Sequence, residues 1–163
     1  MDDGATYSLF IENELKIERA RRELQTKTAT AVITTSSALI ALLVALFALL
    51  AGKDFVFQAG ARWVVIAALA LFFLSAVAAL VAGQLVEYLV ADETTLSRIL
   101  NDHWGDTVND SRLASAWINF DTLVSLRRGC NARSWWLDWA LRLQVLGALA
   151  LALGVGWQIA LLP

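Results

Sequence analysis

The sequence contains one cysteine, one proline and one histidine among its 163 residues, and each scarcity excludes a class of protein. A single cysteine, Cys130, allows no disulfide within the chain and no paired-cysteine metal site. The proline is Pro163, so no proline interrupts a helix before it. The single histidine is His103, so a Cys–His nucleophile would have to pair Cys130 with this one residue, which makes that class of enzyme unfavoured.

Charged residues are also few, whereas apolar residues are abundant. Asp, Glu, Lys and Arg make up 17% of the chain, and the formal net charge is −2, too near neutral to indicate binding to nucleic acid. Hydrophobic residues make up 58%. The mean hydropathy of +0.60 lies above that of ordinary soluble domains, so we expect an integral membrane protein.

Three apolar stretches are long enough to cross a bilayer, which takes about 20 residues. They cover residues 28–52, 63–88 and 143–163. Within hydrocarbon a single segment satisfies its backbone hydrogen bonds only as a helix. The sequence therefore predicts an all-α polytopic membrane protein with three transmembrane helices, folded as one membrane domain over residues 1–163.

The distribution of Lys and Arg predicts the orientation of these spans. Five basic residues precede the first span and six lie in residues 89–142, whereas only Lys53 and Arg62 lie in the loop 53–62. Basic loops stay on the cytoplasmic side of a membrane. We therefore expect a bacterial inner-membrane location, with residues 1–27 and 89–142 in the cytoplasm and the loop 53–62 and the C-terminus outside.

The cytoplasmic N-terminal segment is expected to be helical. Phe10, Ile17 and Leu24 recur every seven residues, and no helix breaker separates this stretch from the first span. One helix of roughly 45 residues would measure about 65 Å. It either lies against the rest of the cytoplasmic part or forms a stalk that packs with copies of itself.

Residues 89–142 are expected to form two or three further helices. Asp92 or Thr94 is a candidate N-cap for the first, and Asn109 or Asp110 for another. Residues 127–129 resemble a helix end, and a helix starting near Asn131 is expected to run into the third span. An apolar stripe within this segment consists of Leu113, Trp117, Phe120 and Val124.

Small and hydroxyl-bearing residues follow one another at helical spacing in all three spans. Such rows let helices approach closely, and the hydroxyls can bond across the contact. Helix packing within one bundle explains the rows, and a water-filled path in a homo-oligomer is the alternative for the first span. The helix-packing or pore-facing candidates are Thr30, Thr34, Ser37 and Ala41, then Ser75, Ala79 and Gly83, then Ala150 and Gly154, with Ala152 and Gly156 as a parallel row.

No catalytic site, metal site or cofactor is expected. The only concentration of metal-capable side chains lies in residues 101–106, where Gly105 favours a solvated loop. Phosphate-binding loops and serine-hydrolase motifs are absent from the sequence. The spans carry no acidic or basic residue away from their ends, which disfavours an ion-coupled transporter. We therefore expect a protein that is not an enzyme.

Two stretches of the sequence carry a resemblance to known proteins. One is the entry to the first span, residues 18–22 (ERARR) and 27–36 (KTATAVITTS). The other is the approach to the third span, residues 126–128 (LRR), 131–133 (NAR) and 136–137 (WL). Together they resemble small actinobacterial integral membrane proteins. More distantly, they are similar to the transmembrane effector domain of Pycsar-type cyclic-nucleotide antiphage systems and its plasmid-transfer relatives.

This resemblance implies an oligomeric membrane effector or channel-like protein that assembles with itself. If the protein senses a ligand, the candidates for contact with its phosphate, or with a lipid headgroup, are Arg127, Arg128 and Arg133. The alternative role of these arginines is to anchor the chain at the inner face of the membrane. The expected partners are membrane lipids and further copies of the chain; a cyclic nucleotide or protein partner is not defined. The alternative is a non-conducting accessory or scaffold subunit of a larger membrane complex.

Overall fold

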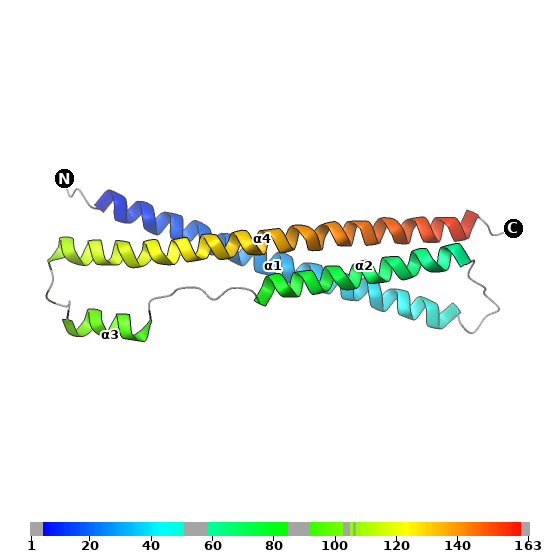
Figure 1. Ribbon diagram of the computed structural model, residues 1–163, viewed down its shortest axis with the longest axis horizontal. Coiled ribbons are helices and arrows are strands. Elements are labelled where there is room, and N and C mark those ends of the chain that lie inside the picture. The colour runs from blue at the N-terminus through cyan, green and yellow to red at the C-terminus, as the bar shows by residue number, and fades with distance from the viewer. Residues whose placement is uncertain (1–4, 51–58, 85–91, 103–104, 106, 161–163) are drawn as a thin grey trace. The chain divides into compact units, whose positions relative to one another are not determined.

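The computed structural model describes residues 5–50, 59–84, 92–102, 105 and 107–160, and the regular structure in these residues is entirely helical. The four helices are α1 (Ala5–Leu50), α2 (Ala59–Gln84), α3 (Glu93–Asp102) and α4 (Val108–Ala160) (Figure 1). Three of them, α1, α2 and α4, are long and apolar enough to cross a membrane. The predictions of an all-α chain and of three such helices are therefore confirmed.

The chain divides into two compact units. Residues 1–25 and 85–132 form one, named here the polar unit because it holds nearly all of the acidic residues. Residues 26–84 and 133–163 form the other, named the apolar unit. Helices α1 and α4 each contribute one segment to each unit.

In the polar unit, the segments of α1 and α4 pack through a small leucine core. Leu15 of α1 is buried against Leu123 and Leu126 of α4. The same unit contains α3, which begins directly after Asp92. The Thr94 hydroxyl and nearby backbone N–H groups bond the Asp92 carboxylate and hold its pKa below the usual value, as expected for an N-cap.

The start and the course of α4 differ from the sequence-based expectation. Its N-cap is Thr107, whose hydroxyl accepts a hydrogen bond from the Asp110 backbone N–H and donates one to the Asp110 carboxylate. The candidates Asn109 and Asp110 were thus wrong, although Thr-x-x-Asp is a readable capping box. The expected helix end at residues 127–129 is also wrong, because α4 continues through them with Gly129 buried.

In the apolar unit, α2 lies beside the segments of α1 and α4 that belong to this unit (Figure 1). Alanine, glycine and serine together occupy most of the buried positions, so the helix backbones approach closely. The buried residues form three groups: Ala29, Ala82 and Leu137; Val32, Ala78, Ala79 and Ala140; and Leu43, Ala68 and Phe72. Each of the first two groups contains residues of α1, α2 and α4. The third contains residues of α1 and α2, and residues of α4 pack against it.

Candidate functional site

A ladder of polar contacts joins α1 to α4 in the polar unit. Arg127 forms ion pairs with both Glu14 and Glu18, the latter over 3.3 Å from Nε to Oε1. Arg21 donates a hydrogen bond of 3.2 Å to the Asn131 side-chain oxygen. The Glu18 side chain is buried, and its ion-pair partners are Arg127 and, over 3.6 Å, Arg21. Arg127 is thus already engaged within the chain.

Replacing Arg127 with alanine is expected to lower the free energy of unfolding by about 2 kcal/mol, because Glu18 would keep a buried charge without its main partner. The Arg127→Ala/Glu18→Gln double variant should recover part of this loss, because the remaining side chain is uncharged. Thermal unfolding in detergent, followed by circular dichroism, measures both. Arg128→Ala is the matched control, since Arg128 is exposed one position away. Equal losses in the two arginine variants would contradict this account.

Arg133 performs a different task in the apolar unit. Its guanidinium donates hydrogen bonds of 2.8 Å to the carbonyl oxygens of Ala82 and Gly83, and one of 3.3 Å to the Thr26 hydroxyl. These carbonyls lie in the last turn of α2, where the helix itself supplies no donor. Arg133 is only 8% exposed, so a phosphate or lipid headgroup would have to displace these bonds.

The predicted rows of small residues divide between the inside and the outside of the chain. Ser75 and Ala79 are buried, and the Ser75 hydroxyl donates a 2.7 Å hydrogen bond to the Ala140 carbonyl. Gly154 is buried and Ala150 partly buried, whereas Gly83 is exposed and uses its carbonyl to bind Arg133. Sequence reasoning missed Gly147, which is also buried and faces Phe72 of α2.

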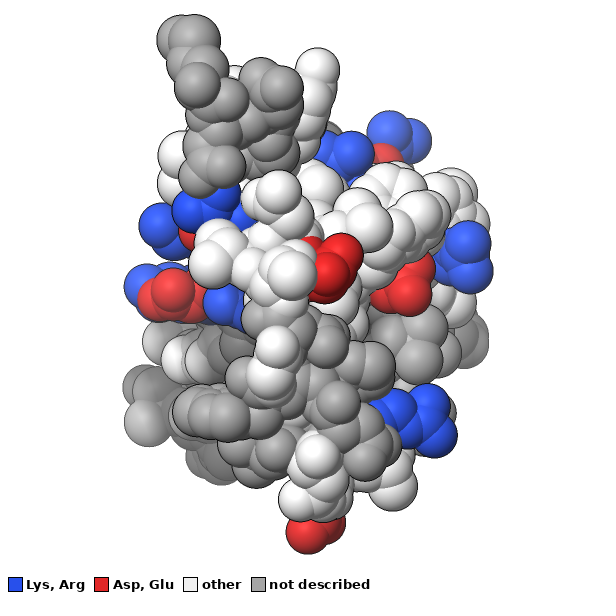
Figure 2. Space-filling model, turned by 90° about the vertical axis from the view of Figure 1, so that its left-hand side faces the viewer, with Lys and Arg blue, Asp and Glu red and all other residues white. Residues whose placement is uncertain are grey.

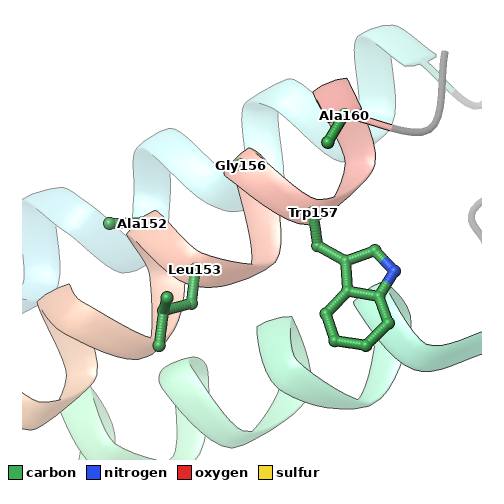
Figure 3. Close-up of a pocket in the computed structure, with 5 residues that line it drawn as sticks. All are labelled: Ala152, Leu153, Gly156, Trp157 and Ala160. Atoms are coloured by element: carbon green, nitrogen blue, oxygen red, sulfur yellow. The ribbon is translucent and has the colours of Figure 1, made fainter.

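The parallel row on α4 lines an open groove of about 480 Å³. Its residues are Ala152, Leu153, Gly156, Trp157 and Ala160, and Leu153 and Trp157 project from the same side of the helix (Figure 3). A Cβ atom added at Gly156 would meet nothing within 4 Å, whereas one added at Gly154 would lie 3.3 Å from Val64 and Val65. One row therefore packs inside the chain and its neighbour faces outward.

The hydroxyl-bearing face predicted for the first span also faces outward. Thr30, Thr34, Ser37 and Ala41 are all exposed. The hydroxyl that the bundle buries belongs instead to Ser36, which is completely inaccessible and has no hydrogen-bond partner in the described parts of the chain. The helical spacing of Thr and Ser in the sequence predicted a hydroxyl-bearing helix face, but it did not indicate which face of the helix packs in the core.

Comparisons with protein-family models, with curated proteins and with solved structures found no match to this chain. Among the described residues, no group of three or more His, Cys, Asp and Glu side chains is placed to hold a metal ion. His103 and Asp106, which belong to the metal-capable stretch 101–106 noted in the sequence, lie outside the described residues.

Proposed function

We propose that this chain is a small self-associating membrane protein whose copies assemble with α1 nearest the symmetry axis. The exposed face of α1 carries the proposal. In the described chain, the Thr34 and Ser37 hydroxyls have no hydrogen-bond partner, unlike Thr30, which bonds the Thr26 carbonyl. Burying an unpaired hydroxyl in hydrocarbon is costly, which favours cover by another helix or by water.

The class of function that fits best is an oligomeric membrane effector or a channel-like protein, as the resemblance in residues 18–36 and 126–137 implies. Three helices enclose no useful pore, so conduction requires a ring of copies. By the distribution of Lys and Arg, the N-terminus and residues 89–142 would lie in the cytoplasm and the C-terminus outside. An accessory subunit of a larger complex is the alternative, with α1 covered by a different protein.

The mass of the particle in nanodiscs or mild detergent tests self-association. We expect a closed assembly of four or more copies by native mass spectrometry, with the lipid or detergent contribution subtracted. A monomer would contradict the proposal, and a fixed complex with a different chain would replace it by the accessory-subunit alternative.

Single cysteines then test whether the α1 face is reached by water. In a Cys130→Ala background, Thr34→Cys and Ser37→Cys should react with a membrane-impermeant thiol reagent if the assembly is channel-like. Leu74→Cys is the matched control, because Leu74 is an exposed apolar residue of α2. Reaction at Leu74→Cys alone would contradict the channel-like reading, and protection of all three positions would favour a non-conducting scaffold.

A further inference from the structure

The polar unit leaves two stripes of large apolar side chains without cover. One lies on α1, where the apolar residues recur every seven positions. The other lies on α4, where successive apolar residues are four, three and four positions apart, as at the contact positions of a coiled coil. Exposed apolar patches of more than a few hundred Å² mark interaction surfaces. The stripe on α1 consists of Phe10, Ile17 and Leu24, which are 63%, 53% and 65% exposed. The stripe on α4 consists of Leu113, Trp117, Phe120 and Val124, which are 61%, 61%, 44% and 36% exposed.

The α4 stripe borders a groove with the volume of a few side chains. The groove measures about 310 Å³ and is lined by Tyr7 and Ile11 of α1 and by Leu113, Ala116, Trp117 and Phe120 of α4. Trp117 and Phe120 stand edge to face with ring centroids 6.1 Å apart. A small-molecule site usually adds polar groups that orient its ligand, which this lining lacks apart from the tyrosine hydroxyl. The lining suits an apolar helix face.

The levels of the two stripes follow from the contacts within one chain. Cross-helix contacts join α1 residues to α4 residues between 105 and 113 positions later, as in Gln25–Cys130 and Glu14–Arg127. The two segments are therefore parallel. Adding these offsets places Phe10 level with residues 115–123 and Ile17 level with residues 122–130. Rotation about an axis along the helices preserves these levels, so Phe10 and Ile17 of one copy lie level with the α4 stripe of its neighbour.

Charges beside the stripes are complementary at the same levels. Lys16 adjoins Ile17 and Asp121 adjoins Phe120, with 105 positions between the two charges in sequence. Both side chains are exposed, and neither has an ion pair within the described chain. Glu23 and Arg128, also exposed, repeat the same offset with the signs reversed. Acidic and basic side chains are likewise interspersed at the end of the molecule that Figure 2 shows.

We infer that a second copy of this chain docks its α1 stripe onto the α4 stripe, with Phe10 entering the groove beside Trp117. The α1 stripe with Tyr7 and the α4 stripe expose on the order of 900 Å² together. Because one contact uses one stripe from each partner, this sum is the area of a whole contact, about half that of a standard interface. Because the contact joins two different surfaces, its repetition builds a ring where the rotation between copies closes and an open filament where it does not. The inference rests on the proposed self-association and identifies its contact in the polar unit.

Cysteine crosslinking of the full-length protein tests this contact. Lys16→Cys and Asp121→Cys are placed in separate Cys130→Ala chains with different tags, co-expressed, purified in detergent and treated with a short bis-maleimide. We expect a crosslinked dimer that carries both tags, at least tenfold more abundant than dimers from either variant expressed alone. Lys16→Cys with Ser115→Cys is the matched control, because Ser115 is exposed on α4 but lines a different groove.

The particle mass, measured on the same preparations, separates the two proposals. An oligomer without the mixed crosslink would overturn the docking of these stripes and leave self-association intact. Efficient crosslinking of Asp121→Cys alone would also overturn it, since that result requires two α4 stripes to face each other. A monomeric particle would reject both the docking and the self-association on which it rests.

Discussion

Replacing Arg133 with alanine is expected to destabilise the apolar unit more than any other single loss of charge. The change removes a buried donor from the Ala82 and Gly83 carbonyls at the end of α2. Hydrogen bonds to a charged donor contribute about 1.5–3 kcal/mol each, so the expected loss is about 3 kcal/mol or more. The midpoint of unfolding in increasing sodium dodecyl sulfate, followed by circular dichroism, measures it.

Two further variants separate charge from geometry in this prediction. Arg133→Lys keeps the positive charge near the C-terminus of α2 but cannot bond both carbonyls in the manner of a planar guanidinium, so an intermediate loss is expected. Arg142→Ala is the control on the same helix, because Arg142 is exposed, pairs with the exposed Asp138 and lies over the exposed Trp139 ring. If Arg133→Ala and Arg142→Ala unfolded alike, the cap would contribute nothing.

Replacing Gly147 with leucine is expected to force α4 away from α2. A Cβ atom at position 147 would already lie 3.1 Å from Phe72 and 3.3 Å from the Cβ atom of Leu71. Phe72 is itself completely buried, so its ring has little room to move. Overpacking of this kind costs about 1–3 kcal/mol, and a branched side chain at a helix crossing should reach the upper end. The same unfolding experiment measures the loss.

Gly156→Leu is the matched control for this substitution. Both glycines lie in α4, yet a Cβ atom at Gly156 meets nothing within 4 Å. The control should leave the stability of the chain unchanged or raise it slightly, because leucine favours a helix more than glycine does. A large loss in the control, or none at Gly147, would show that α2 and α4 do not approach as described.

The difference between these glycines shows what the spacing of small residues in the sequence does not predict. Small residues at four-residue spacing predicted close helix contacts in the third span, and Gly154 lies in such a contact. The neighbouring row through Ala152 and Gly156 has the same spacing, but it faces outward. Spacing records that a row lies on one side of a helix. It contains no information on which side receives a neighbour.

The positions of charged residues in the sequence also did not predict their contacts. Arg127, Arg128 and Arg133 formed one basic group in the sequence, suited to an anion or to the inner face of a membrane. In the folded chain Arg127 pairs with two glutamates, Arg133 caps α2 and Arg128 is exposed. The contacts of Arg127 and Arg133 are with residues about 50 to 110 positions away in the sequence, and no local sequence pattern identifies such partners.

The sequence by itself determined the helical class and the three apolar helices, because both follow from composition and from the absence of internal proline. Each of these properties is local: a run of apolar residues and an uninterrupted backbone suffice to form a long helix. Tertiary structure alone decided that α4 continues through residues 127–129, that Ser36 rather than Thr34 is buried, and that Gly147 meets Phe72. The physical reason is that burial depends on the rotation and register of one helix against another, which close packing of the whole chain determines.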